Sequence, residues 1–417
     1  MTAVEPVRAC RSCLGPVPLP FLTLGELAVA NRLPVDPSVV EERFLLSVGF
    51  CPACSLVQLT HALPPDAVFD ADYPYFSSYS EGLVRHAAEH VASLIADRGL
   101  DRESLVVEVA SNDGYLLQHV VAAGVRAVGV EPTPGPAAAS RARNVPTVQA
   151  FFGQALAAEL VAEHGRADVV VANNVMAHVP DLNDFVRGLA ELVADDGVIT
   201  IENPGVDSLL AQCAFDTIYH EHYCYFSTLT VESLARRHGL QLVHVEEFPQ
   251  LHGGTLRWRL ARSGYLSPAA TTRLEAERAQ GLDQFSSYQN FGERVASLQR
   301  QLRSELLRLK LSGQSIAAYG AAAKGATLLG STGIDATTID FVVDRNEHKH
   351  GRYLPGTGIP VLPVEALVQR RPDVVLLLAW NVVEEVVRQQ QPYLDAGGTF
   401  LLPVPEVRTL RTGPAGR

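Results

Sequence analysis

Lysine is scarce in this sequence, which contains Lys310, Lys324 and Lys349 but 31 arginines. Acidic residues outnumber basic ones by 46 to 34, so the formal net charge is −12, and no basic run stands out. Binding to a phosphate backbone depends on clustered positive charge, so we expect no nucleic acid as a partner. A lysine in an unusual place becomes a candidate functional residue.

Long apolar runs are absent as well. No segment reaches the roughly 20 apolar residues that a membrane helix needs, and the N-terminus MTAVEPVRACRSC lacks the pattern of a secretory signal. We therefore expect no membrane partner and a cytoplasmic protein. With 417 residues, of which 47% are hydrophobic and 19% charged, the chain is long enough for two or three globular domains.

Cysteines are few, but four of the six are paired in sequence. The motif CRSC contains Cys10 and Cys13, and CPAC contains Cys51 and Cys54. Two Cys-x-x-Cys turns can supply the four corners of a tetrahedron, as in a structural zinc site. Disulfides are disfavoured without a secretory signal, and a redox pair is the weaker alternative. We predict one Zn2+ that organises a module over residues 1–68 and has no open position for catalysis.

The most informative stretch is SLVVEVASNDGYLLQHVVAAGVRAVGVEP. It predicts a strand over 105–109, a polar turn, a helix over 115–123, and a second strand over 125–130 that ends in Glu131. A carboxylate at the tip of a second strand can bind the hydroxyls of a ribose, while the turn and the start of the helix approach the rest of a nucleoside. This unit therefore predicts a nucleoside site.

The alternation of strands and helices then continues. A strand breaks into a loop within 167–181, a helix follows over 182–193, and another strand over 197–204 has a polar end. Alternating elements indicate an α/β fold with a doubly wound parallel sheet, whose ligands bind at the carboxyl ends of the strands. Asn173 and Asn174 lie at such an end.

The turn ASNDG lacks the G-x-G-x-x-G spacing of a pyrophosphate site, and its acidic Asp113 would repel a phosphate. A nucleoside with a cationic tail suits it better. S-adenosylmethionine (SAM) is such a ligand, because its ammonium and sulfonium groups tolerate nearby carboxylates; a tight turn without a ligand is the alternative. The predicted SAM-binding residues are Glu108, Ser111, Asn112, Asp113, Gly114, Glu131, Asn173 and Asn174.

A smaller Rossmann-like domain is predicted over 312–417, after a helical connection over 269–311. Small residues in its turn YGAAAKG allow the backbone to approach a ligand, and Lys324 stands at the helix start, so the turn fits a diphosphate. The basic residues after the next strand could equally form a solvated turn, and a nicotinamide cofactor is the rival ligand. The predicted substrate contacts here are Lys324, Asp344, Arg345, Trp380 and Asn381.

The segment YHEHYCYF, residues 219–226, consists almost entirely of side chains that can donate, accept or carry a proton. It could bind a metal, perform acid–base chemistry or form a satisfied polar patch. His220, His222 and Cys224 would share one side of a regular strand and could form a zinc trio. The polar context argues against such regular alternation.

The paired cysteine motifs, EVASNDG, NNVMAHVPD, YHEHYCYF, LHGGTLR and YGAAAKG occur in this order. As an ordered set, they resemble the zinc-binding, SAM-dependent C-methyltransferases of nucleotide-linked deoxysugars, over essentially the whole chain. The resemblance implies a SAM-methyltransferase domain over 69–268, which together with the zinc module and the C-terminal domain encloses a dTDP-4-keto-6-deoxysugar. It also implies methylation of a carbon next to the ketone, commonly C-3 and in some members C-5, in making branched sugars of bacterial antibiotics.

Methylating such a carbon requires a base, a donor to the developing oxyanion and exclusion of water. By the resemblance, His222 is the base, Glu221 orients or tunes it, and Tyr219 donates to the ketone or enolate oxygen. His178, in NNVMAHVPD, is a second donor or an alternate base.

Two further points follow from the resemblance. Tyr73, with Tyr75 as its rival because the register of that segment is uncertain, reaches the sugar from the N-terminal side. SAM-binding turns often have Gly where this chain has Ala110, which leaves the first contact of the turn open.

Three other functions remain alternatives. An RNA methyltransferase with a zinc recognition module is disfavoured by the charge of −12. A nicotinamide-dependent oxidoreductase would bind NAD(H) and not SAM. A non-catalytic partner protein is hard to reconcile with so many protic side chains at strand ends. The sequence is compatible with a monomer or a homodimer.

Overall fold

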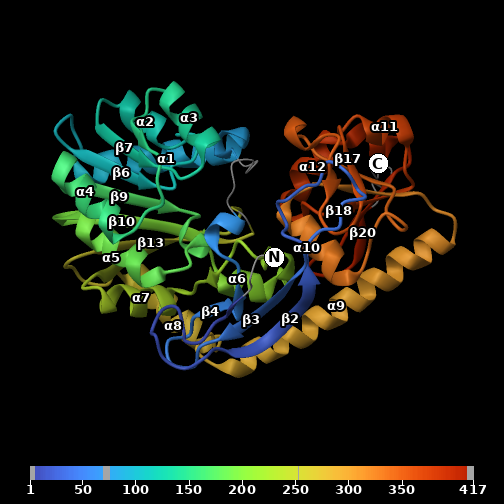
Figure 1. Cartoon of the computed structure of the whole chain (residues 1–417), viewed down its shortest axis with the longest axis horizontal. Coiled ribbons are helices and arrows are strands. Elements are labelled where there is room, and N and C mark those ends of the chain that lie inside the picture. The colour runs from blue at the N-terminus through green and yellow to red at the C-terminus, as the bar shows by residue number, and fades with distance from the viewer. Residues whose placement is uncertain (1–4, 69–75, 252, 411–417) are drawn as a thin grey trace, which may run out of the picture.

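The computed structural model describes residues 5–68, 76–251 and 253–410. Two α/β units lie on either side of a small antiparallel sheet, and one long helix runs beneath that sheet toward the second unit (Figure 1). The predicted α/β class, with an N-terminal cysteine module and two sheets built of alternating strands and helices, is confirmed.

The small sheet belongs mostly to the N-terminal module. In the order β11-β4-β3-β2 it contains β11 (Cys224–Tyr225), β4 (Val57–Leu59), β3 (Phe44–Phe50) and β2 (Leu19–Leu27). A separate pair is formed by β1 (Glu5–Pro6) and β5 (His61–Ala62). The edge strand β11 comes from the segment YHEHYCYF, which is thereby attached to the cysteine module.

The central unit is built on a seven-stranded sheet of order β12-β13-β10-β9-β6-β7-β8. Its strands are β6 (Leu105–Val109), β7 (Arg126–Val130), β8 (Thr147–Val148), β9 (Ala167–Asn173), β10 (Val193–Pro204), β12 (Gln241–Phe248) and β13 (Thr255–Ala261). The strands from β10 to β8 are parallel, whereas β13 and β12 extend the sheet in antiparallel fashion. Parallel strands are covered on both faces, which explains why β6 is entirely buried.

Helices α1 to α7 surround this sheet: α1 (Glu81–Arg98), α2 (Leu117–Ala122), α3 (Pro134–Ala142), α4 (Gln154–His164), α5 (Leu182–Leu192), α6 (Val206–Ala211) and α7 (Thr228–Arg237). Three of them begin at side-chain caps that satisfy a free backbone N–H. Ser80 accepts from Leu83 at the start of α1, and Asp181 and Ser227 serve α5 and α7 in the same way.

The C-terminal unit has the sheet order β16-β17-β15-β14-β18-β19-β20. Its strands are β14 (Ile316–Tyr319), β15 (Phe341–Val343), β16 (Tyr353–Leu354), β17 (Ile359–Leu362), β18 (Val374–Leu377), β19 (Thr399–Leu402) and β20 (Arg408–Leu410). Its helices are α10 (Ala323–Thr332), α11 (Ala366–Arg370), α12 (Val383–Gln389) and α13 (Gln391–Asp395). The five inner strands are parallel, and the strands at both edges are antiparallel.

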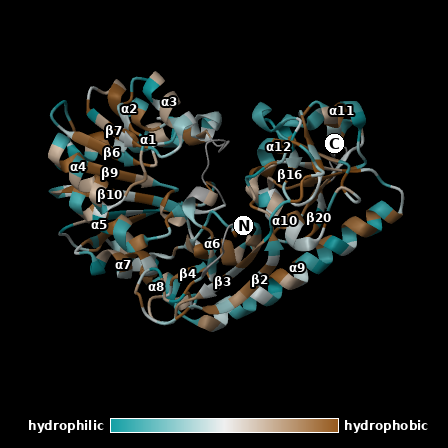
Figure 2. Cartoon of the chain, in the orientation of Figure 1, coloured by the Kyte–Doolittle hydropathy of each residue, from teal (hydrophilic) through white to brown (hydrophobic). Residues whose placement is uncertain are grey.

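Two helices connect the α/β units, α8 (Pro268–Ala279) and the long α9 (Phe285–Leu311). The buried side chains of α9 recur every three or four residues, so one face of the helix is apolar along its length. Near its start, Tyr288 stacks on Phe50 of β3 with ring centroids 4.7 Å apart. Figure 2 shows this stripe and the apolar strands of the sheets. The helix therefore ties the N-terminal sheet to the C-terminal unit.

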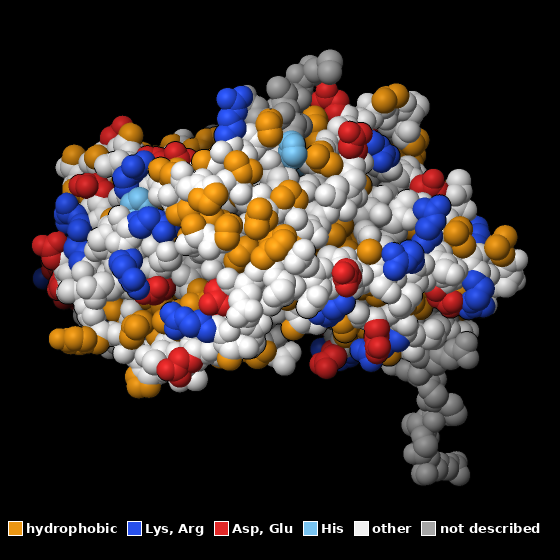
Figure 3. Space-filling model, turned by 90° about the horizontal axis from the view of Figure 1, so that it is seen from below, with side chains coloured by type: hydrophobic (Ala, Val, Ile, Leu, Met, Phe, Trp, Pro, Cys, Tyr) orange, Lys and Arg blue, Asp and Glu red, His pale blue; other side chains and the backbone are white. Residues whose placement is uncertain are grey.

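None of the helices in the described ranges is long and apolar enough to cross a membrane. On the face of the molecule seen from below, Lys and Arg side chains are interspersed with Asp and Glu around a central group of hydrophobic side chains (Figure 3). This mixed distribution agrees with the net charge of −12.

Candidate functional site

The four paired cysteines converge as predicted. Their sulfur atoms all lie within 4.8 Å of one another, with Cys10 Sγ 3.5 Å from Cys54 Sγ and Cys13 Sγ 3.6 Å from Cys51 Sγ. The two motifs fold alike, because a residue with positive φ follows each second cysteine: Leu14 (58°) and Ser55 (61°). Four converging thiols fit a structural Zn2+ and leave no ligand position for substrate.

The segment YHEHYCYF does not form a second metal group. His220 Nε2 donates to the carbonyl of Phe44 at 3.1 Å, and His222 Nδ1 donates to that of Thr217 at 2.9 Å. Cys224 lies in β11, paired with Gln58. Among the described residues, the converging metal-ligand group is that of the paired cysteines.

The turn after β6 folds tightly onto the sheet. Ala110, Asn112 and Gly114 all have positive φ values, of 57°, 48° and 76°. Ala110 therefore adopts the conformation that glycine commonly supplies, at the cost of some strain. A Cβ on Gly129 of β7 would lie 2.4 Å from the Ser111 hydroxyl, so that hydroxyl packs against the sheet. Close packing of the turn thus depends on a glycine in the neighbouring strand.

The carboxylate of Glu131 holds this turn in place. One of its oxygens accepts the backbone N–H of Asn112 at 3.0 Å, and the other accepts that of Thr133 at 2.8 Å. The Asn112 side chain accepts the backbone N–H of Ser77 at 2.8 Å. Asp113 pairs with Arg143 at 2.9 Å, so its charge is partly neutralised.

Several buried carboxylates crowd this edge of the central sheet. Neither carboxylate oxygen of Glu108 has a hydrogen-bond partner in the described structure. Burial and three neighbouring carboxylates, those of Asp113, Glu131 and Glu202, raise the pKa of Glu108 well above its ordinary value. A cationic ligand would offset the repulsion among these crowded carboxyl groups, so the residues fit the ammonium and sulfonium of SAM.

Polar residues at the ends of β9 and β10 complete this edge. Asn173 is in register with Glu202, its side-chain oxygen has no partner in the described structure, and the backbone N–H of Asn174 donates to Glu202 O at 2.7 Å. Burial would raise the pKa of Glu202, but the hydrogen bond of His86 and the charge of Arg257 outweigh it and hold that pKa to about 2. His86 and Arg257 were not predicted as site residues, because they pair with Glu202 across 116 and 55 positions of the sequence and leave no local signal.

A second cluster joins His178, Tyr219 and His222, the residues predicted for catalysis. Tyr219 Oη lies 2.8 Å from His222 Nε2, and the rings of His178 and His222 have centroids 4.6 Å apart. A carbonyl can only accept, so the bond to Thr217 O places the proton of neutral His222 on Nδ1. The Nε2 atom then carries the lone pair and accepts from the Tyr219 hydroxyl.

Burial keeps this cluster neutral. Burial, followed by the proximity of His178, lowers the pKa of His222 well below its ordinary value. Burial also lowers the pKa of His178 to about 4, although its Nδ1 donates to Glu221 O at 2.8 Å. At neutral pH both imidazoles therefore have the form in which they can accept a proton.

Glu221 was predicted to orient or tune the imidazole of His222. Both of its carboxylate oxygens are buried without a hydrogen bond of normal geometry, and Asn31 and Arg32 are its polar neighbours. Burial raises the pKa of Glu221 to about 7, against the weaker opposing effects of these two residues. Its backbone contacts the cluster directly, because the Glu221 carbonyl accepts from His178 Nδ1.

The turn after β14 shows where the predicted substrate residues lie. Asp344 accepts the backbone N–H of Ala321 at 2.7 Å, and Arg345 pairs with Glu385 at 2.9 Å. Lys324 lies over the ring of Trp380, with Nζ 4.7 Å from the centroid, and Trp380 Nε1 donates to Asp216 at 2.6 Å.

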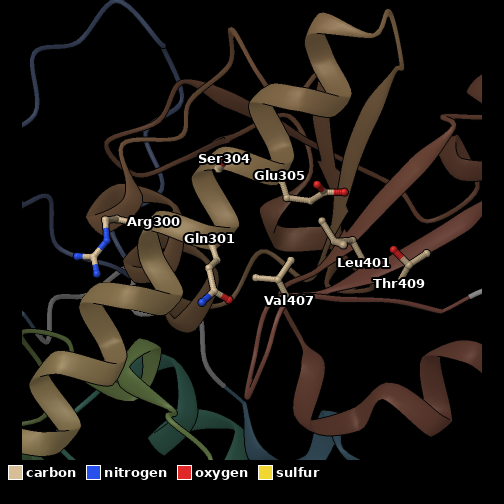
Figure 4. A pocket seen from close by; sticks show the side chains of 7 residues that line it. All are labelled: Arg300, Gln301, Ser304, Glu305, Leu401, Val407 and Thr409. Atoms are coloured by element: carbon tan, nitrogen blue, oxygen red, sulfur yellow. The ribbon is translucent and has the colours of Figure 1, made fainter.

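A small cavity borders this region. It has a volume of about 210 Å3 and lies between the β12–β13 turn and the C-terminal unit, with Trp380, Asn381, Gln250 and Arg408 in its lining. A second cavity, of about 460 Å3, lies between α9 and strands β19 and β20 (Figure 4). None of the predicted site residues lines the second cavity, so we assign it no part in the reaction.

Asp216 and Tyr225 were missed as site residues. Both are buried, and each has a side-chain oxygen without a partner in the described structure. Asp216 precedes Thr217 in the same 3-10 turn, and the ring centroid of Tyr225 lies 6.0 Å from that of His222. Asp216 is a single acid in the apolar stretch CAFDTIY, immediately before the protic segment, which is a usable signal. Tyr73 and Tyr75 lie outside the described residues.

Comparison with known proteins divides the chain into three matching regions. A zinc binding domain matches residues 10–69, a methyltransferase domain 83–245, and a C-methyltransferase C-terminal domain 250–405. The C-methyltransferase NovU of Streptomyces niveus is 34% identical over 412 residues, which cover 98% of each chain.

Other matches are partial. A ubiquinone biosynthesis O-methyltransferase of Azorhizobium caulinodans is 30% identical over 120 residues, which are 28% of this chain and 46% of that one. Among solved structures, the magnesium protoporphyrin IX methyltransferase of Synechocystis PCC 6803 with bound SAM is 15% identical. It covers 44% of this chain and 80% of its own, with a TM-score of 0.34.

Proposed function

This chain belongs to the C-methyltransferase family and is a zinc-containing, SAM-dependent C-methyltransferase, and we propose that it methylates a carbon next to the ketone of a nucleotide-linked sugar. The proposed substrate is a dTDP-4-keto-6-deoxysugar, with C-3 as the reacting carbon and C-5 as the alternative, in the biosynthesis of a branched sugar for a bacterial natural product. The observation that carries the proposal is the hydrogen-bonded chain from Thr217 through His222 to Tyr219.

The two nucleoside sites have separate tasks. SAM, when bound, supplies an electrophilic methyl group on a positively charged sulfur. The carboxyl groups of Glu108, Asp113 and Glu131 crowd together beside the turn after β6, where burial and mutual repulsion raise the pKa of Glu108, and a cationic ligand would offset that repulsion. The turn after β14 and the adjoining strand ends, with Asp344, Arg345, Trp380 and Asn381, bind the sugar nucleotide.

Proton removal is the task of His222. In the structure, the Tyr219 hydroxyl donates to His222 Nε2. When a ketone is bound, Tyr219 donates to the carbonyl oxygen instead, which frees the Nε2 lone pair to take the proton from the neighbouring carbon. The new Nε2–H then donates to the Tyr219 oxygen, so Tyr219 keeps its own proton directed at the enolate.

The bond to Thr217 makes this exchange possible. With the proton of His222 fixed on Nδ1, only Nε2 can act as the base. Burial disfavours the imidazolium, but the enolate that forms beside it carries the opposite charge and offsets that penalty. His178, whose ring is 4.6 Å away, bounds the same space. Because its Nδ1–H donates to Glu221 O, neutral His178 presents an acceptor lone pair on Nε2 and is the alternate base.

The direct test uses purified protein with SAM and a panel of dTDP-4-keto-6-deoxysugars. Mass spectrometry should detect one added methyl group on at least one of these sugars, and NMR should place it on a carbon next to the ketone. The same protein should not oxidise or reduce any sugar of the panel when given NAD(H). Hydride transfer without methylation would contradict the proposal.

A further inference from the structure

Lys324 is a half-buried residue at the junction of the two α/β units. It is the second residue of α10, which packs against the 3-10 turn Phe215–Thr217 of the central unit. The ammonium nitrogen is shielded from solvent and has no hydrogen-bond acceptor in the described structure. The Nζ atom lies over the ring of Trp380, 4.7 Å from its centroid.

The other two lysines do not share this situation. Lys310 Nζ donates to Asp340 at 2.7 Å. Lys349 Nζ donates to Ala321 O at 2.9 Å and lies 3.7 Å from Asp344. A buried ammonium without an oxygen partner is costly, since it has lost its water without a replacement. Of the three lysines, Lys324 is therefore the one whose ammonium group an anionic or strongly polar ligand would stabilise most.

Lys324 lies close to the residues of the catalytic cluster. Burial raises the pKa of Asp216 and lowers that of His222, and the charge of Lys324 opposes the first effect and adds slightly to the second, so the ammonium lies within electrostatic reach of the base. The 3-10 turn against which α10 packs also contains Thr217, whose carbonyl fixes the His222 tautomer. By contrast, Arg345 and Lys349 follow β15 and already have acidic partners.

Trp380 and Asp216 hold the ammonium in place. Asp216 is fully buried and accepts from Trp380 Nε1 at 2.6 Å, which fixes the ring over which Lys324 lies. The second oxygen of Asp216 has no partner in the described structure. The negative charge of Asp216 also favours the protonated lysine, because it raises the pKa of Lys324 against the larger lowering effect of burial.

We propose that Lys324 binds the ketone oxygen of the sugar and stabilises the enolate oxygen while His222 removes the neighbouring proton. This step rests on the proposed function, and its electrons and proton are all accounted for. The C–H electron pair becomes the C=C bond of the enolate, the carbonyl oxygen takes the negative charge, and the proton moves to His222 Nε2. When the carbon then attacks the methyl group of SAM, the C=O bond re-forms and S-adenosylhomocysteine leaves.

This assignment makes the C-terminal unit part of the reaction as well as of substrate binding. A positioned donor aimed at a developing oxyanion typically contributes about 10²–10³ in rate. Two donors from different units, Tyr219 and Lys324, would then meet at one oxygen. The enolate could form only when the substrate bridges both.

The experiment compares Lys324→Met with Lys310→Met, since each removes one lysine charge. The substrate's proton next to the ketone is followed by NMR as it exchanges with deuterated water, without methyl transfer. Lys324→Met should exchange about 10²–10³-fold more slowly, and methyl transfer should fall equally, with SAM affinity and the substrate KM within a few-fold of wild type. Lys310→Met should exchange at the wild-type rate.

Lys324→Arg keeps the charge and should recover part of the exchange rate, which a merely structural role would not predict. Exchange by folded Lys324→Met at the wild-type rate, or a raised KM with unchanged kcat, would overturn the inference and assign the lysine to the diphosphate. A wild-type enzyme that exchanges no ketosugar proton would instead overturn the proposed function, and this step with it.

Discussion

The turns after β6 and after β14 are held by the same kind of hydrogen bond but differ in the charged groups around them. In the central unit, Glu131 at the tip of β7 accepts the N–H of Asn112, and in the C-terminal unit, Asp344 after β15 accepts that of Ala321. The first turn is surrounded by further carboxylates, whereas the second has Lys324, whose ammonium group is buried. The fold therefore determines where each turn lies, and we propose that the neighbouring charges determine which ligand it binds.

Between the two turns lies a third region, which neither α/β unit builds alone. The segment YHEHYCYF pairs with β4 through β11, and two of its side chains anchor it to the cysteine module. His220 donates to Phe44 O, and Tyr223 donates to Leu63 O at 2.7 Å. The cysteine module thus holds the segment that contains Tyr219 and His222, the residues proposed for catalysis.

The largest expected effect follows from removing the zinc. Replacing Cys51 by Ser should eliminate the bound zinc and lower the free energy of unfolding by several kcal/mol, because structural zinc sites contribute about 10–16 kcal/mol of binding free energy in small peptides. Turnover should be lost, since the module positions YHEHYCYF. Metal analysis and denaturant unfolding measure the effect, and Cys213→Ser is the control. Full zinc occupancy with normal stability would rule out the four-cysteine site.

The next effect separates chemistry from binding. His222→Asn should lower turnover by about 10²–10⁴-fold, the usual contribution of a general base, while calorimetry finds both ligands bound as before. The variant should also fail to exchange the substrate proton with deuterated water. His178→Asn is the matched control on the neighbouring strand end. If His222→Asn exchanged normally and His178→Asn did not, the base would be His178.

A smaller effect concerns pH and Glu221. The folded protein holds a proton on this carboxyl up to a pKa of about 7, whereas an unfolded glutamate releases it near pH 4.5. The stability from this group is therefore present below pH 4.5 and is lost as the pH rises to about 7. Between pH 4.5 and 8, Glu221→Gln should gain on the order of 3 kcal/mol of unfolding free energy relative to wild type. Denaturant unfolding at both pH values measures this difference. If Glu221 had the ordinary pKa of a glutamate, the unfolding free energies of the variant and of wild type would change with pH by the same amount.

The smallest effect tests the difference between the turns directly. Glu131→Ala should weaken SAM binding by about 1–3 kcal/mol, as expected for a lost charge-assisted hydrogen bond. Asp344→Ala is the matched change in the other turn. It should leave SAM affinity unchanged and weaken binding of the sugar nucleotide. Calorimetry with each ligand in turn measures both. Equal effects of the two variants on SAM would show that the turns are not specialised.

Features with a local signal could be predicted from the sequence. Short local patterns predict three such features. Residue spacing predicts the cysteine pairs, and the change from an apolar strand to a polar turn predicts the turns after β6 and after β14. The grouping of His178 with Tyr219 and His222 was also expected, from the resemblance of their motifs to those of a known family. The structure places all three in one cluster.

Features that depend on pairing across the chain were not predictable in this way. The addition of β11 to the N-terminal sheet joins residues about 170 positions apart, and Asp216 meets Trp380 across 164 positions. The antiparallel β12 and β13 likewise follow from packing at the sheet edge rather than from the alternating pattern. Such features depend on tertiary contacts between distant segments, and the local sequence pattern does not show which segments will meet.

The most direct test of the central claim is the position of the transferred methyl group. SAM labelled with carbon-13 in its methyl group is incubated with the enzyme and a dTDP-4-keto-6-deoxysugar, and the product is examined by carbon-13 NMR. The account predicts a labelled methyl bonded to carbon and correlated with the adjacent ketone carbon, at C-3 or C-5. A label found on a sugar oxygen would contradict it, because oxygen methylation needs neither the enolate nor a base beside the ketone.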